Sequence, residues 1–473
     1  MAENIGLSRS LKSRHVSMIS LGGIVGAGLF VGSSAAIASV GPAVVVSYAL
    51  AGLIVMVVMR MLSEMVAATP GVGSFTEYIR LALGDWAGFV SGWLYWYSWV
   101  IVVAIEALAG ARLLQEWLAL AVWQLVLLLM LTLTGVNLLS SRSFGEFEFW
   151  LASIKVAAIV LFILITGAFA LGLSSPGGPT FANMVDHGGF APFGWASVLA
   201  GMTTVIFSMC GAEMATIAAA ESSESARVVS RMTTSIIVRI LLFYVVSVLL
   251  IVCVTPWTHV RSGSSPFALA LQHVGVPGAA TIMNLVVLTA VLSCLNSGLY
   301  VTSRVLFTLA SRGDAPRGLL AVSRRRVPAR AILLGSSLGY AAVILSIIAP
   351  EGLFSFLVNA SGAVMIFVYL FVCFAHLKLR RKLEEQDPSR LTVKVWLFPG
   401  ASWLTVCAMI GVLGAMATRP DVASQLYASL AALGVALAGY WLVRARRRAA
   451  ARGPLRDGAG AWNALAEKKK DLC

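Results

Sequence analysis

Three ionisable residues stand inside long apolar stretches of the sequence and could do chemistry there. They are Glu106 in VVAIEALAG, Lys155 in SIKVAAIV and Glu213 in FSMCGAE. A charge inside a bilayer is costly, so an intramembrane ionisable residue is a functional candidate by default. Lys155 could take up and release a proton, and Glu106 could neutralise a substrate amine or take a proton. Glu213 could hold a gate by hydrogen-bonding unwound backbone.

A structural interpretation of each residue stays open from the sequence alone. Lys155 could snorkel to a nearby cytoplasmic interface, Glu106 could pair with another side chain, and Glu213 could cap a helix end. A fourth carboxylate, Glu64, falls at the inner end of an apolar run and is expected to be solvated there. The aromatic residues of 93–99 fit packing or an interfacial belt better than a cation cage.

The stretch Ser20 to Gly32, SLGGIVGAGLFVG, is apolar but rich in glycine. Each glycine costs about 0.8–1 kcal/mol relative to alanine inside a helix, so a spanning helix is weakened here. Unpaired backbone groups are tolerated at membrane depth only where they face protein or a water-filled cavity. The N–H groups of a half-helix that begins near Gly28 suit a carboxylate, and the carbonyls of the preceding half-helix suit an ammonium. The stretch therefore predicts a site for a zwitterion.

Close helix packing or a phosphate-binding loop could also place glycines in this stretch. The pairs Gly22/Gly26 and Gly28/Gly32 have the spacing of close helix-packing seams, which would account for most of the glycines without any ligand. A phosphate-binding loop is disfavoured, because no strand precedes the stretch and the glycine spacing is wrong.

The composition requires a bilayer to position these residues. Hydrophobic residues make up 59% of the 473 residues and charged residues 12%, and the mean hydropathy is +0.88. We expect an all-α polytopic membrane protein with about twelve transmembrane helices, since each needs roughly 20 apolar residues. The expected spans are 16–39, 42–63, 85–111, 119–139, 149–172, 194–220, 235–256, 278–310, 331–349, 352–377, 395–417 and 423–443. The polar segment 1–15 leads directly into the first span, so no cleavable signal peptide is expected.

The net charge of +14 is distributed unevenly over the expected loops. All Lys and Arg residues fall on one side, apart from Arg112, Arg261 and Arg419 opposite and Lys155 within a span. The positive-inside rule then predicts both termini in the cytoplasm and an even number of spans. The basic tail, 444–473, is expected to touch anionic lipid headgroups, and no nucleic-acid partner is expected.

Cysteine and histidine give no sign of catalysis. Five of the six cysteines lie in apolar runs or at their ends, and Cys473 ends the tail. The five histidines lie at span ends and in loops, and neither residue type shows CxxC or metal-ligand spacing. They predict neither a disulfide set nor a metal site nor a triad. We therefore expect no cofactor and no enzymatic activity.

The order of the spans indicates a repeat of architecture. Segments 16–172 and 194–377 would each hold an odd number of spans and open with an interrupted helix, at GGIVGAG and at FSMCGAE. The second set must then enter the membrane from the opposite side, which makes the repeats inverted. Interrupted helices at matching positions of inverted repeats mark the binding site of secondary transporters. The two spans of 395–443 lie outside the repeat.

Several long motifs carry a resemblance to a known family. LKSRHVSMISLGGIVGAGLFVGS, MRMLSEMVAATPGVGSFTEYI, FGEFEFWLASIKVAAI and SCLNSGLYVTSRVLFTLASRGDAP resemble the bacterial amino acid permeases of the amino acid-polyamine-organocation superfamily. MRMLSEM, GWLYW and TIAAAES most resemble the permeases of that superfamily for 4-aminobutyrate (GABA).

The resemblance implies a leucine-transporter-like fold with a five-plus-five inverted repeat and discontinuous helices 1 and 6. It also implies a transporter that imports an amino acid, GABA in the first place, together with a proton. Lys155 would stand where sodium-coupled relatives hold an ion. The family often has Thr or Ser where Ala27 stands, so the backbone alone would bind the carboxylate here. The implied backbone contacts are Gly26, Ala27 and Gly28 for the substrate carboxylate, and carbonyls near Ile24, Phe207, Ser208 and Cys210 for its amine.

The sequence leaves three alternative functions open. The first is a permease of the same family for another substrate (an aromatic amino acid, proline or another neutral amino acid). A channel is a second, weakened because no filter-like repeat is present, and a non-transporting membrane receptor for amino acids is a third. We expect a multi-pass protein of the bacterial cytoplasmic (inner) membrane whose partners are lipid, an amino acid and a proton. The oligomeric state cannot be derived from the sequence.

Overall fold

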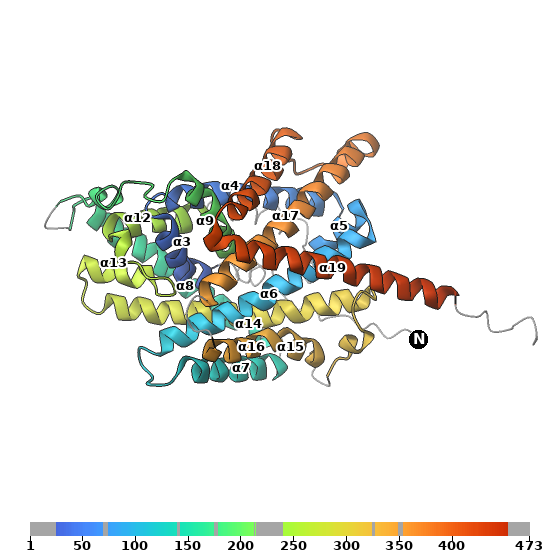
Figure 1. Ribbon diagram of the computed structural model, residues 1–473, viewed down its shortest axis with the longest axis horizontal. Helices are drawn as coiled ribbons and strands as arrows, with labels where there is room; N and C mark the ends of the chain where they lie inside the picture. The colour runs from blue at the N-terminus through green and yellow to red at the C-terminus, as the bar shows by residue number, and fades with distance from the viewer. Residues whose placement is uncertain are drawn as a thin grey trace, which may run out of the picture.

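A computed structural model describes residues 25–69, 74–139, 142–174, 178–211, 213, 240–323, 327–348 and 353–452. All regular structure in these segments is helical (Figure 1). By length and composition, eight of the helices could cross a membrane, and four shorter ones of 10–17 residues are also apolar. The all-α class expected from composition is confirmed.

The first half of the chain forms α2 (Ala27–Phe30), α3 (Gly32–Val40), α4 (Val44–Ala68), α5 (Phe75–Leu83), α6 (Asp85–Leu114), α7 (Val122–Leu139), α8 (Arg142–Ala170) and α9 (Trp195–Met209). The second half forms a π-helix (Ile240–Val246), α12 (Ser247–Val254), α13 (Pro266–Val274), α14 (Ala279–Ser311), α15 (Ala329–Gly335), α16 (Ser337–Ile348), α17 (Leu353–Gln386), α18 (Gly400–Ala417) and α19 (Pro420–Arg452). Short 3-10 helices cover Phe181–Met184, Trp257–His259, Arg317–Leu320 and Pro388–Arg390.

Both predicted interruptions coincide with helix ends. The helix α2 begins at Ala27, after an extended Gly26 with φ −135° and ψ −152°. The helix α9 ends at Met209, where Cys210 turns to ψ 146° and Gly211 follows with φ 109°. Only glycine adopts that φ without strain, so Gly211 prevents α9 from continuing. Ile24 and the glycines before it lie outside the described residues.

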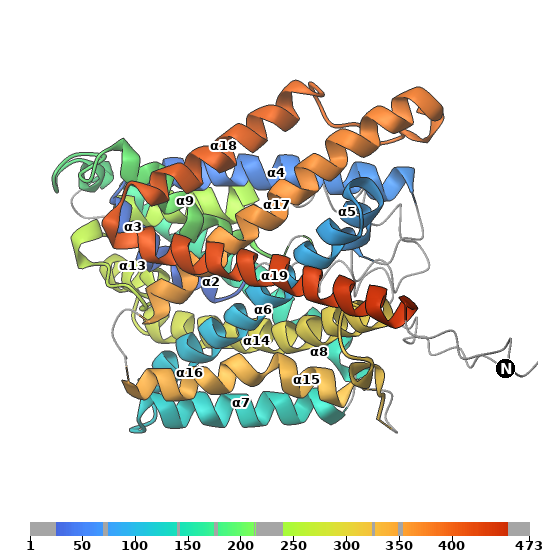
Figure 2. The same cartoon turned by 45° about the vertical axis from the view of Figure 1, so that its right-hand side comes forward.

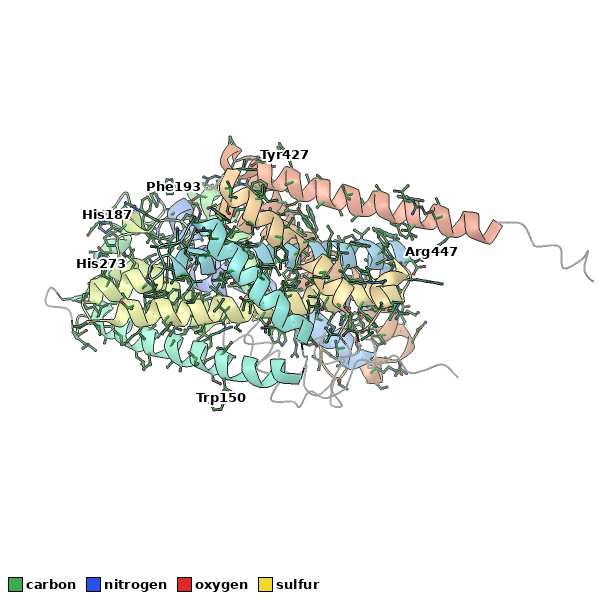
Figure 3. The ribbon with its side chains drawn as sticks, turned by 90° about the horizontal axis from the view of Figure 1, so that it is seen from below. Trp150, His187, Phe193, His273, Tyr427 and Arg447 are labelled. Atoms are coloured by element: carbon green, nitrogen blue, oxygen red, sulfur yellow. The ribbon has the colours of Figure 1, made fainter. Side chains whose placement is uncertain are left out.

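Long helices form the centre of the bundle and shorter ones flank it. The helix α6 packs against α14 and α17, and α19 lies across α17 and α6 (Figures 1 and 2). On one flank α7 lies beside α16, and on the opposite flank α4 lies beside α18 (Figure 2). His187, Phe193 and His273 lie at one end of the bundle, whereas Arg447 lies near the other (Figure 3).

At the Arg447 end, ion pairs tie three helices together. Asp314, which is 4% exposed, pairs with Arg80 and lies 3.0 Å from Arg447 Nη2. Glu77 lies 3.4 Å from Arg80 Nε and 2.9 Å from Arg312 Nη2. Burial alone would lower the pKa of Arg80, but the Asp314 and Glu77 carboxylates raise it above its usual value. The aspartate of the GDAP segment therefore connects α5, the end of α14 and α19.

The expectation that Glu64 is solvated at the interface is wrong. Glu64 is 2% exposed, and its Oε1 lies 2.7 Å from Arg380 Nη1 and 3.3 Å from His376 Nε2. The N–H of Val395 donates to Glu64 Oε2 at 2.6 Å. The partners come from α17 and from the loop before α18, so this buried cluster joins α4 to elements more than 300 positions away in the chain.

We expect Glu64→Ala to lower the free energy of unfolding by about 3–5 kcal/mol, because it leaves the buried Arg380 without its only buried carboxylate partner among the described residues. A matched control is Glu384→Ala, which removes the other carboxylate of Arg380, at 2.8 Å but with a 43% exposed side chain. This control should cost less than about 1 kcal/mol. Denaturant unfolding of both purified variants in detergent measures the difference. Equal losses of unfolding free energy in the two variants would mean that the buried Glu64 contact contributes no more to stability than the exposed Glu384 contact.

Candidate functional site

The predicted site lies where α2 begins and α9 ends, and a glycine permits the close approach. A Cβ on Gly28 would lie 2.6 Å from Ser208 Cα, so the two backbones touch with no room for a side chain. The packing-seam interpretation of the glycines therefore applies at Gly28. The same contact brings the beginning of α2 to the end of α9, the two sets of backbone groups that the resemblance implies for the substrate carboxylate and its amine. The half-helix before α2, whose carbonyls the zwitterion hypothesis assigns to the ammonium, lies outside the described residues.

A carboxylate from α6 occupies the beginning of α2. The N–H of Ala27 donates to Glu106 Oε1 at 3.0 Å and to Glu106 Oε2 at 3.1 Å. Glu106 is 1% exposed. A Cβ on Gly26 would lie 2.6 Å from Glu106 Oε1 and 2.7 Å from Cys294 Sγ, so Gly26 also allows a close contact. The Cys294 side chain also hydrogen-bonds to Glu106, which fits the pairing interpretation, and a contact of Glu106 with a substrate amine stays a prediction.

The carbonyls at the end of α9 are partly engaged. The hydroxyl of Tyr244, in the π-helix, donates to the Ser208 carbonyl at 2.8 Å, and the N–H of Cys210 donates to the Phe207 carbonyl at 3.1 Å. A carbonyl oxygen has two lone pairs, so each can still accept a second hydrogen bond. Phe207, Ser208 and Cys210 line one cavity together with Gly26 and Gly28.

Glu213 lies beside the end of α9 and contacts unwound backbone. Its Oε1 accepts from the N–H of Gly211 at 3.1 Å, and its Oε2 accepts from the Tyr369 hydroxyl of α17 at 3.1 Å. The side chain is 1% exposed. The hydrogen bond to unwound backbone is therefore present, and it also suits the structural-cap interpretation. A gating role of Glu213 stays a prediction.

Lys155 is buried between α8 and α14. Its exposed fraction is 0%, and its Nζ donates to Ser293 Oγ at 2.8 Å. This burial does not fit a lysine that snorkels to the interface. Ser293 directly precedes Cys294, so the cation lies next to the helix segment that lines the cavity at Gly26.

The cavity between these residues is small. Its volume is about 10 Å³, which is space for about one water molecule. Sequence reasoning missed three of its lining residues, Trp99, Val102 and Cys294. Trp99 and Val102 precede Glu106 by seven and four positions, so helical spacing could have placed them on its face. For Cys294 no such signal exists in the sequence.

In the parts of the chain that the structure describes, no three His, Cys, Asp or Glu side chains come together as a metal-binding group. What the site offers a ligand is backbone polar groups, two buried carboxylates and a buried ammonium nearby. Such an arrangement can bind a small molecule that carries both charges.

The sequence family described as amino acid permease matches residues 15–451. A gamma-aminobutyric acid permease of Bacillus subtilis is 47% identical over 444 residues, which cover 93% of this chain and 95% of that protein. A gamma-aminobutyric acid permease of Escherichia coli is 42% identical, over 91% of this chain and 93% of its own length.

Two further similarities extend beyond these permeases. An aromatic amino acid transport protein of Corynebacterium glutamicum is 38% identical, covering 90% of this chain and 92% of its own. Among solved structures, a manganese transporter of Eremococcus coleocola superposes with a TM-score of 0.58 over 92% of this chain and 94% of that one. Its sequence identity is 14%, so that likeness concerns the fold alone.

Proposed function

Because this chain belongs to the amino acid permease family, we propose that it is a proton-coupled secondary transporter that imports a small amino acid, GABA in the first place. The protein is a transporter and not an enzyme. The observation that carries the site is the contact of Gly28 with Ser208, which joins a helix beginning to a helix end inside the bundle. GABA is favoured because relatives named for it are 41–47% identical over at least 91% of this chain.

We propose that the transport cycle is alternating access in a twelve-span protein with a five-plus-five inverted repeat. The eight long helices and the four shorter apolar ones support this count, and α2 with α3 and α9 would be the discontinuous helices 1 and 6. The placement of Lys and Arg supports cytoplasmic termini in the bacterial inner membrane. The cavity of about 10 Å³ is too small for an amino acid, so substrate binding requires it to widen.

The proposed site binds the substrate carboxylate at the backbone of Gly26, Ala27 and Gly28. The amine would be received by the carbonyls near Phe207, Ser208 and Cys210, which line the same cavity. Lys155, Glu106 and Glu213 are the candidates for proton coupling and gating. Backbone groups bind charge without regard to the side chain of the ligand, so the size of the cavity in its open state would select the amino acid.

The deciding experiment is uptake of labelled GABA into proteoliposomes under an imposed proton gradient, with competition by other amino acids. Accumulation above the external concentration supports a coupled transporter. Binding without accumulation would indicate a receptor, and currents above carrier turnover would indicate a channel. Stronger competition by phenylalanine or proline than by unlabelled GABA would assign the permease to another amino acid; the aromatic transporter at 38% identity makes the aromatic case worth including.

We expect the carboxamide of GABA to compete for uptake about 10- to 100-fold more weakly than GABA, because charged hydrogen bonds contribute about 1.5–3 kcal/mol each. 5-Aminovalerate is the control, since it changes the length but keeps both charged ends. Inhibition constants against labelled GABA give the comparison. If the carboxamide competes as well as GABA, the backbone of Gly26–Gly28 does not bind a carboxylate.

A further inference from the structure

The N–H of Ala27 already has a carboxylate partner within the protein. Both oxygens of Glu106 lie within hydrogen-bonding distance, at 3.0 Å and 3.1 Å, and the two residues are 79 positions apart. Glu106 is 1% exposed and comes from α6, which packs beside α2 (Figure 2). It therefore lies against the same backbone at which the substrate carboxylate is proposed to bind.

The N–H of Ala27 is a single donor, and both oxygens of Glu106 already share it. The cavity at this backbone has a volume of about 10 Å³. Glu106 Oε1 lies so close to Gly26 that a Cβ built on Gly26 would be only 2.6 Å from this oxygen. A substrate carboxylate that takes the Ala27 N–H must therefore displace Glu106.

We propose that Glu106 is the internal occupant of the carboxylate site and that it makes the permease select zwitterions over simple carboxylic acids. The inference rests on the proposed carboxylate site at Gly26–Gly28. A simple acid that enters replaces one anion by another and leaves two carboxylates buried together, which is unfavourable at low dielectric. A zwitterion brings an ammonium that pairs with the displaced Glu106.

The lining of the cavity supports this exchange. Glu106 and the end of α9 at Ser208 face the same small space, so an ammonium held by the α9 carbonyls lies within reach of a carboxylate that has left Ala27. Glu213 differs, because its oxygens are held by Gly211 and Tyr369. It provides a second buried carboxylate next to the site, held by partners outside α2.

The test compares an amino acid with its deaminated acid in Glu106→Gln. The amide oxygen can still accept from Ala27, so the variant keeps the shape and loses the charge. Inhibition constants of GABA and butyrate are measured by competition in proteoliposomes. In the parent, GABA should bind at least about 100-fold more tightly than butyrate. The reason is that the interaction energies of an unlike-charged and a like-charged pair differ by several kcal/mol at such contacts. In Glu106→Gln, tighter binding of butyrate should reduce this ratio at least about tenfold.

Glu384→Gln is the control, because it removes a carboxylate of α17 whose side chain is 43% exposed and which does not line the cavity; in this variant the ratio should change less than about twofold. Should Glu106→Gln not fold, Glu106→Asp offers a second test. Its carboxylate is one methylene shorter and cannot keep both oxygens at Ala27, so butyrate should again bind more tightly than in the parent, to a smaller degree. An unchanged ratio in the Glu106 variants, or a parallel loss of both ligands, would overturn the proposal and leave Glu106 with a structural role.

The outcome separates this inference from the choice of substrate. If the parent binds another amino acid instead of GABA, the GABA assignment fails, and the same ratio is measured with that amino acid and its deaminated acid, such as phenylalanine and 3-phenylpropionate. If the parent binds no amino acid at all, the proposed function and the inference fall together.

Discussion

Gly28→Leu should insert into the membrane normally yet retain less than about 1% of parental GABA uptake, since overpacking forces backbone shifts and small misplacements cost large factors in rate. Even a Cβ at this position would lie 2.6 Å from Ser208 Cα, and that neighbour is backbone, which no rotamer change can move. The leucine would separate α2 from the end of α9, and the two charged ends of a zwitterion would lose their common site.

Gly411→Leu is the matched control for this variant. Gly411 lies in α18, and no heavy atom of the described structure comes within 4 Å of a Cβ built there. The same glycine-to-leucine change should therefore leave uptake near the parental level. Uptake per inserted protein, quantified by labelling of purified proteoliposomes, gives the comparison. Uptake retained in Gly28→Leu would remove the α2–α9 contact from the proposed site.

Lys155→Met should bind substrate and exchange it across the membrane but fail to accumulate it against a gradient. Methionine keeps most of the volume of a side chain that is 0% exposed, so the variant removes the ammonium without leaving a large cavity. If a proton accompanies a zwitterion, positive charge enters, and a negative-inside potential contributes about 2.3 kcal/mol per 100 mV to accumulation. Without the proton carrier that driving force is lost.

Uptake with and without an imposed proton gradient, in the same proteoliposomes, is the measurement for Lys155→Met. Lys378→Met, which removes an exposed cation of α17, should accumulate substrate like the parent. Gradient-driven accumulation at the parental level in Lys155→Met would instead assign the coupling to Glu106 or Glu213.

Local sequence patterns determined the class of the protein and the positions of its interruptions. Long apolar runs predicted helices because a backbone in lipid must satisfy its hydrogen bonds within one segment. Glycine predicted the helix ends near Gly26 and Gly211 because its effect on the backbone is local. A missing Cβ permits the extended or left-handed backbone that ends a helix. The apolar surroundings of Glu106, Lys155 and Glu213 made them candidates for intramembrane groups, whereas the sequence left open a Lys155 that snorkels to the interface.

Only the tertiary structure decided which groups meet. Nothing within a helical turn of Glu106 indicates Ala27, 79 positions earlier, and nothing near Glu64 indicates Arg380 or the Val395 N–H. The same holds for Asp314 and Arg80. Spacing in a sequence specifies the face of one helix on which a side chain lies, because helical geometry is periodic. Which other helix packs against that face, and in what register, depends on the shapes and volumes of all the side chains between them.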